Sequence, residues 1–234
     1  MPQTGSADFE AAYTSMTNGI VTDMSENTSE RFGGAPESPR ERMLNSATEL
    51  FQRNGVAGTA LSDIVEHSGA PRGSLYHYFP EGKSQIAAEA TAQAGRQLGA
   101  MITVLTATHS PVETIRLMVG HFRRQLEDSG FTAGCPAAPG ALEGGAAGSE
   151  ARRAAGEAFT TWEATVAAAF WQRGLDAGEA DALATLVISA VEGALVLGKA
   201  QQSTRALDRV ERALIAQVES LMPNASGATA VTDG

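Results

Sequence analysis

Apolar residues recur at helical spacing through most of this chain, and no segment keeps the strict alternation of a half-buried β-strand. Alanine and leucine dominate the second half, and glycine and proline separate the periodic segments. The pattern therefore predicts an all-α fold. The helices are expected at about residues 39–54, 60–68, 72–79, 83–107, 111–128, 136–146, 150–173, 177–201 and 204–222.

The first of these helices has clear signals at both ends. Ser38 is placed as the N-cap, Pro39 stands at the first helical position, and Glu41 completes a capping box. Gly55 can supply the positive φ that the end of a helix favours. The apolar stripe between these ends consists of Met43, Leu44, Ala47, Leu50 and Phe51.

Two shorter helices follow, and a tight turn separates them. Thr59 is expected to cap the second helix, and the turn from Gly69 to Pro71 precedes the third. Leu75 and Phe79 are one helical turn apart, so the third helix buries both on one side. Three short helices with a glycine turn between the last two are typical of a helix-turn-helix.

Changes in composition divide the chain into four parts. Residues 1–38 are polar and acidic and are expected to form a disordered tail. Residues 39–84 form the predicted helix-turn-helix DNA-binding domain, and residues 85–222 a larger helical domain for effector binding and dimerisation. Residues 223–234 are expected to be a second flexible tail.

The distribution of charge is compatible with DNA binding, although the net charge is −10. Residues 1–38 contribute −5 of this total, whereas residues 39–84 carry five charges of each sign. The candidate DNA-binding domain is therefore the least acidic part of the chain. The balance argues against a strongly basic protein that coats nucleic acid without regard to sequence.

Several classes of protein are disfavoured. The single cysteine, Cys135, excludes an internal disulfide framework and fits a reducing cytoplasm. The four histidines have no metal-ligand spacing with it, so neither a metal site nor a cofactor is expected. No catalytic triad or phosphate loop indicates an enzyme. No apolar run looks long enough to span a bilayer and no signal peptide is apparent, so a cytoplasmic protein without membrane contact is expected.

The third helix carries the residues that could read DNA. A recognition helix must present small and hydrogen-bonding side chains to a major groove about 12 Å wide. Gly73 and Ser74 allow close approach, and Arg72 can donate twice to a guanine. Tyr76, His77 and Lys83 can reach phosphates or base edges. Tyr76 could instead pack within the domain, and Arg72 and His77 could be ordinary surface groups.

The stretch LSDIVEHSGAPRGSLYHYFPEGKSQI resembles the DNA-binding domain of the tetracycline-repressor (TetR) family. Pro71 departs from the family pattern, which often has a capping Ser or Thr there. The resemblance rests on Gly69, Gly73, Leu75, Tyr76 and Phe79. It implies backbone contacts from Thr59 and Ser62, a phosphate contact from Lys83, and a recognition surface made by Arg72, Gly73, Ser74, Tyr76 and His77.

Two segments of the second half resemble the LmrA/YxaF-type C-terminal domain of TetR regulators. They are GCPAAPGALEGG at residues 134–145 and SAVEGALVLGKAQQS at residues 189–203. This resemblance implies an all-helical domain that binds an effector and forms the dimer. It also implies that the effector is hydrophobic or aromatic.

The last two helices are the candidates for a homodimer interface. The helix at 177–201 is apolar around much of its girth, which indicates burial on more than one side. Gly193, Ala194 and Gly198 would permit close approach of another helix. We therefore expect an isologous four-helix contact between two copies. Core packing within one subunit is the alternative.

Large adaptable side chains in the second half are candidates for an effector pocket. Glu192 lies in an apolar stretch, where it could orient a polar ligand atom or pair with an arginine at an interface. Cys135 has no neighbouring cation in the sequence, so an inert thiol is expected. The apolar candidates, each of which could be simple core, are Met101, Met118, Phe122, Trp162 and Phe170.

These expectations combine into a transcriptional regulator. A dimer would place two recognition helices about one DNA turn apart on double-stranded operator DNA, so the operator should be a near-palindrome. A small-molecule effector in the second domain would release a repressor from that operator. The alternative is a dimeric DNA-binding regulator without an effector, which a protein partner or its own abundance controls.

Overall fold

The computed structural model describes residues 37–71, 73–145 and 148–222, and within them every regular element is a helix. The predicted all-α fold is confirmed, and the two predicted tails lie almost entirely outside the described residues. The elements are α4 (Pro39–Asn54), α5 (Leu61–Ser68), α6 (Leu75–Tyr78), α7 (Lys83–Thr108), α8 (Pro111–Asp128), α9 (Ala138–Ala141), α10 (Ser149–Trp171), α11 (Ala177–Gln201) and α12 (Arg205–Leu221).

Helices α4, α5 and α6 form a small unit, called the head below, around one apolar cluster. α6 is buried through Leu75, and Phe79 directly after it is fully buried. The cluster continues into the first turns of α7, so the head has no core of its own that is separate from α7. Its buried members are Met43, Leu44, Ala47, Phe51, Val56, Ile64, Val65, Ala70, Leu75, Phe79, Ile86, Ala87, Ala90 and Ala151.

Two local expectations for the head were wrong. The N-cap of α5 is Ala60, not Thr59, because the Thr59 hydroxyl is buried and donates back to the Gly55 carbonyl at 2.9 Å. Helix α6 is four residues long and begins after Ser74, whereas the prediction began at residue 72. The Ser74 amide and hydroxyl both donate to the Pro71 carbonyl, so a turn occupies the place of the expected first helical turn.

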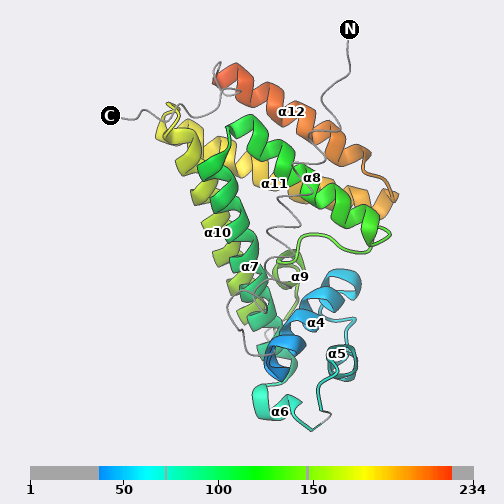
Figure 1. Cartoon of the computed structure of the whole chain (residues 1–234). Helices are drawn as coiled ribbons and strands as arrows, with labels where there is room; N and C mark the ends of the chain where they lie inside the picture. The colour runs from blue at the N-terminus through cyan, green and yellow to red at the C-terminus, as the bar shows by residue number, and fades with distance from the viewer. Residues whose placement is uncertain (1–36, 72, 146–147, 223–234) are drawn as a thin grey trace. The chain divides into compact units, whose positions relative to one another are not determined.

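Helix α7 takes part in both apolar clusters. Ile86, Ala87 and Ala90 belong to the head, whereas Leu98 and Ile102 belong to the core of the C-terminal domain. Figure 1 shows α10 running beside α7 along most of its length. The head and the C-terminal domain are therefore joined by one continuous helix.

The approach of α7 to α10 is close because glycine stands at the contact. A Cβ atom on Gly95 would lie 2.6 Å from the Ala158 Cβ, nearer than two carbon atoms can pack. The indole of Trp162, which is 1 % exposed, donates to the Gly95 carbonyl at 2.9 Å. Gly95 lies beside Ala158. Four residues further along α7, Gly99 lies beside Trp162, which is four residues further along α10, so the two helices run parallel.

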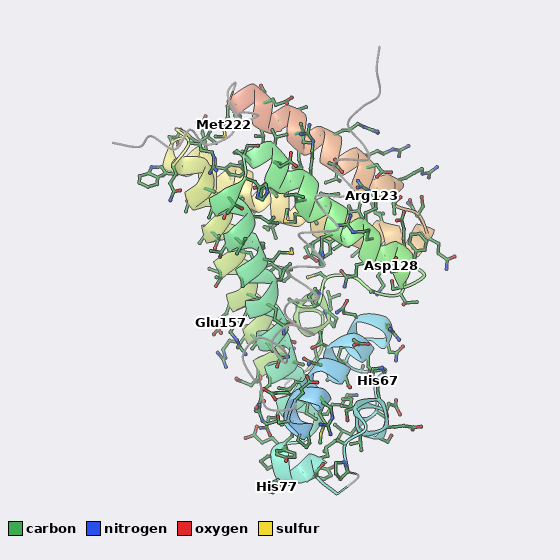
Figure 2. The ribbon with its side chains drawn as sticks, in the orientation of Figure 1. His67, His77, Arg123, Asp128, Glu157 and Met222 are labelled. Atoms are coloured by element: carbon green, nitrogen blue, oxygen red, sulfur yellow. The ribbon has the colours of Figure 1, made fainter. Side chains whose placement is uncertain are left out.

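Helices α8, α11 and α12 complete the C-terminal core. Arg123 of α8, labelled in Figure 2, donates to Asp208 at 3.0 Å and to Glu211, both of α12. Contrary to the sequence expectation, α11 is long and apolar enough to cross a membrane by length and composition. Because it packs against α8, α10 and α12 and buries its apolar side there, we interpret it as a core helix.

The close α7–α10 contact makes Gly95→Ala destabilising. We expect the free energy of unfolding to fall by about 1–3 kcal/mol, because the new methyl group must displace Ala158. Gly156→Ala on the exposed side of α10 is the control, because nothing lies within 4 Å of its added Cβ. That variant should gain about 0.5–1 kcal/mol from the loss of glycine in a helix. Urea denaturation followed by circular dichroism measures both, and equal effects would contradict the close contact.

Candidate DNA-binding and effector sites

The outer face of the head presents most of the residues that were predicted to read DNA. Tyr76 is 67 % exposed, and Gly73 and His77 are exposed beside it. Figure 2 shows His77 at the outer edge of the head. Ser62 of α5 is also exposed, and its hydroxyl donates to Asp63. Arg72, the predicted guanine contact, lies outside the described residues.

Glycine at position 73 is not required by packing. A Cβ atom added there would meet no other atom within 4 Å. Gly73 does not have a positive φ, so the backbone conformation does not require glycine at this position either. The structure therefore leaves room for a side chain at Gly73, and the close approach of DNA at this position stays a prediction.

Two residues that were predicted to contact DNA form hydrogen bonds within the protein. Thr59 is fully buried, and its hydroxyl donates to carbonyl groups at the end of α4, so it does not present its side chain to DNA. Lys83 donates to the Ala57 carbonyl at 3.1 Å from a partly exposed position. Lys83 can leave that bond for a phosphate, since the carbonyl is an uncharged partner.

The recognition surface is attached firmly to α7. The Arg40 guanidinium lies 5.2 Å from the centre of the Phe79 ring and pairs with Glu89 of α7. Gly82, directly before α7, has a φ of +64°, a conformation that favours glycine. A Cβ on Gly82 would lie 3.6 Å from the Tyr76 ring. Arg40 of α4 thus contacts both the residue that follows α6 and a residue of α7.

The structure does not bring all the predicted effector residues to one pocket. Met118 and Phe170 line a cavity of only about 10 Å³ among α7, α8, α10 and α11, which is about the volume for one water. Phe122 and Trp162 are buried in the same core, and Met101 packs against it. In this conformation these five residues form core, the alternative given above for each.

Glu192 lies at a different cavity. This second cavity has a volume of about 310 Å³ and is bounded by the end of α4, the segment 134–143 and α11. Burial raises the pKa of the Glu192 carboxyl, while a hydrogen bond with the Cys135 thiol opposes the rise. Within this chain, the Cys135 thiol is therefore a partner of Glu192.

Gln52, near the end of α4, is the main polar link between the head and the C-terminal domain. Lys199 of α11 donates to its backbone carbonyl at 2.7 Å. The Gln52 amide oxygen accepts from Gln125 of α8 at 2.9 Å and from the Gly134 amide at 3.3 Å. Carbonyl groups in the last turn of a helix lack intrahelical partners, so Lys199 caps α4 from another domain. Sequence reasoning missed this link, because a glutamine on a helix surface carries no periodic signal.

A stripe of exposed side chains runs along α11. Leu186 and Leu197 are 45 % and 49 % exposed, and Ser189 and Gly193 lie between them on the same side of the helix. The spacing of these four positions follows the helical period, so they form one continuous face. The other sides of α11 are buried in the core. The described chain thus leaves one apolar face of its most apolar helix without a partner.

Among the described residues, no group of three or more His, Cys, Asp or Glu side chains is arranged to hold a metal ion. Cys135 is 4 % exposed, and burial, followed by the nearby Glu192 charge, raises the pKa of its thiol well above the usual range. The reactive thiolate is therefore scarce at neutral pH.

Comparison with known proteins decides the family. Residues 43–90 match the model of the bacterial regulatory proteins of the tetR family. Residues 111–213 match the model of the LmrA/YxaF-like C-terminal domain of transcriptional regulators. The HTH-type transcriptional regulator Rv0196 of Mycobacterium tuberculosis is 38% identical over 183 residues, which cover 76% of this chain and 93% of that protein. The chain belongs to the TetR family.

Solved structures of TetR regulators share the fold. One from Chloroflexus aurantiacus has a TM-score of 0.64 and 28% identity, and the match covers 77% of this chain and 93% of that one. CifR, crystallised with a 26-base-pair operator duplex, has a TM-score of 0.62 and 24% identity over 74% of this chain and 94% of that one. This TetR protein is therefore a DNA-binding transcriptional regulator and not an enzyme.

The raised pKa of the Cys135 thiol predicts that this thiol is alkylated slowly in the native protein. We expect iodoacetamide at pH 8 to alkylate the native protein at least about tenfold more slowly than the urea-unfolded protein, since burial hides the sulfur and disfavours the thiolate. The native rate should continue to rise above the pH at which an ordinary thiol is fully ionised. Mass spectrometry of quenched samples measures the rates, and equal rates in both states would contradict an inert thiol.

Proposed function

We propose that this TetR protein is a cytoplasmic homodimeric repressor that leaves a palindromic operator when a small molecule binds its C-terminal domain. The observation that carries the proposal is the exposed face of α6, which is attached to α7 and therefore to the C-terminal core. The resemblance to CifR, a protein crystallised on operator DNA, supports the DNA-binding part.

The proposed DNA surface consists of residues from the turn before α6, from α6 itself and from its neighbours. Gly73 allows the backbone to approach, and Tyr76 and His77 are exposed where phosphates or base edges would lie. Thr59 is left out because its side chain is buried. The complete set is Ser62, Arg72, Gly73, Ser74, Tyr76, His77 and Lys83.

A dimer explains the exposed face of α11. An apolar stripe centred on Leu186 and Leu197 can contact its own copy across a two-fold axis, with Gly193 allowing the helices to approach closely. Leu221 of α12 is 38 % exposed and extends the apolar surface to the second predicted interface helix. The two heads of such a dimer would meet successive turns of the major groove.

Release by an effector requires a ligand that favours the conformation unable to bind DNA. Complete switching needs a difference in affinity of about 10⁴ between the two states. The cavity of about 310 Å³ beside α4 is large enough for a small ligand, and this supports an effector. The cavity at Met118 and Phe170 holds only about 10 Å³, which instead favours the alternative of a regulator without an effector in its core.

The function is tested by selecting bound sequences from a pool of random duplexes at about physiological salt. A palindromic motif with half-sites about 10 base pairs apart is expected, because a two-fold dimer presents two identical heads. Enrichment of a single, non-repeated half-site would contradict the dimeric reader. No enrichment at all, from folded protein, would contradict specific DNA recognition.

Two substitutions separate base contacts from phosphate contacts on the selected duplex. Arg72→Ala should cost about 1–3 kcal/mol of binding free energy and relax the preference at one base pair. Lys83→Met should weaken binding to every sequence about equally and reduce the salt slope by about 1. Fluorescence anisotropy over a series of salt concentrations measures both. Equal loss on all sequences for Arg72→Ala would make that residue a phosphate contact.

The proposed interface predicts that Leu186→Glu produces monomers. A carboxylate at the centre of an apolar two-fold contact would be desolvated and would face its own copy. Val104→Glu is the matched control, because Val104 is 46 % exposed on α7 and Leu186 is 45 % exposed. Sedimentation velocity should show a dimer for the wild type and the control only. Dimers of both variants would place the interface elsewhere.

A further inference from the structure

The cavity of about 310 Å³ is lined by residues from the end of α4, from α9 and from the second half of α11. Its walls are mostly apolar and include Val56, Pro139, Leu195 and Val196. Volumes of about 300–1,000 Å³ with a few polar groups are typical of small-molecule sites. The cavity therefore has both the size and the lining of a ligand site, and it touches the head directly.

Two ionisable groups of α11 mark the polar ends of this cavity. Glu192 and Lys199 are seven residues apart, so they share one side of the helix and are separated along its axis by about 10 Å. Leu195 and Val196 lie between them and supply apolar wall. A ligand that satisfies both ends must be elongated, with a polar group at each end of an apolar body.

The charges of the lining favour an anionic ligand. Burial lowers the pKa of the Lys199 ammonium, whose partner is the uncharged Gln52 carbonyl, and among the described residues it forms no ion pair. Arg53, which pairs with Glu49 at 3.8 Å, is the other cation of the lining. Burial raises the pKa of the Glu192 carboxyl, which weakens its tendency to carry a charge. The remaining acid in the lining is Glu143.

We propose that this cavity binds an elongated organic carboxylate. The carboxylate pairs with the Lys199 ammonium, and a neutral hydroxyl group at the far end of the ligand forms a hydrogen bond with the Glu192 carboxyl. The apolar body between them packs on Leu195 and Val196. The effect of this ligand on operator binding rests on the proposed function. The ligand site does not depend on it.

Binding of the carboxylate would loosen the link between α11 and α4. Lys199 now caps the Gln52 carbonyl at 2.7 Å, and a carboxylate is a stronger partner for an ammonium than a carbonyl is. When Lys199 turns to the ligand, the end of α4 loses its cap and the head loses one of its polar contacts with the C-terminal domain. Because DNA binding requires the head in a fixed position, the ligand and the operator would oppose each other.

The probes for the test are 8-hydroxyoctanoate, octanoate and 8-amino-1-octanol, applied to the full chain by isothermal titration calorimetry. All three are built on an unbranched chain of eight carbon atoms. We expect 8-hydroxyoctanoate to bind more tightly than octanoate, which lacks the second oxygen, and 8-amino-1-octanol to bind at least about tenfold more weakly than 8-hydroxyoctanoate, because it brings a cation to Lys199. Equal binding of the carboxylate and the amine would overturn the proposal.

Two substitutions test whether 8-hydroxyoctanoate binds in this cavity. Lys199→Met removes the cation at similar length and should raise the Kd for 8-hydroxyoctanoate at least about tenfold. Glu192→Leu should remove the preference for 8-hydroxyoctanoate over octanoate without weakening octanoate. Arg116→Met is the control, because Arg116 lies on α8 outside the cavity and pairs with Glu113. A loss of affinity in Arg116→Met that matches the loss in Lys199→Met would overturn the site.

Operator binding separates this inference from the proposed function. Wild-type protein should lose affinity for its selected duplex as 8-hydroxyoctanoate is added, whereas Lys199→Met should bind the duplex more weakly from the start and respond no further. If the duplex binds tightly and 8-hydroxyoctanoate neither binds nor acts, the inference fails and the function stands. If 8-hydroxyoctanoate binds through Lys199 and no duplex is bound, the function fails and the site stands.

Discussion

The parallel packing of α7 against α10 is the contact on which the rest of the described structure depends. α7 buries Ile86 in the head and Ile102 in the C-terminal core, and complete burial of each such side chain contributes about 1.5–3 kcal/mol. Ala151 at the beginning of α10 belongs to the cluster of the head as well. A change in the angle of this helix pair must therefore repack both clusters at once.

This arrangement couples the C-terminal core to the head, which carries the proposed DNA surface. Interdigitated cores move between discrete packings rather than deforming smoothly, so a local change at one end of α7 is carried to the other end. The bond from Lys199 to Gln52 adds a second route, from α11 to the end of α4, that does not pass through α7. The head is thus fixed to the C-terminal domain at two separate places.

The sequence predicted those features that follow from helical period and from capping residues. Every helix except α6 and α9 was placed to within about two residues at each end, since the long apolar stripes leave little choice. α6 was predicted too long, because the turn from Pro71 to Ser74 satisfies the backbone by a local bond that periodicity does not reveal. The exposure of Tyr76 and His77 agrees with their predicted place on the outer face.

The effector residues were harder to predict, since periodicity tells which residues are buried but not which helices meet. Met118 and Phe170 line one small cavity, whereas Glu192 lies at another cavity with Cys135 and Lys199. The role of Gln52 depends on three partners from distant parts of the chain, Gln125, Gly134 and Lys199. No pattern local to residue 52 could indicate it.

The central claim, that each head is held rigidly on the C-terminal domain, is tested most directly by the distance between the two heads of the proposed dimer. A spin label on Glu49→Cys in a Cys135→Ser background places one label on the exposed side of each α4, because Cys135 is the single cysteine. Pulsed electron resonance should give one narrow distance population in the free protein and one with operator DNA. A broad distribution in the free protein would show flexibly tethered heads and contradict the claim.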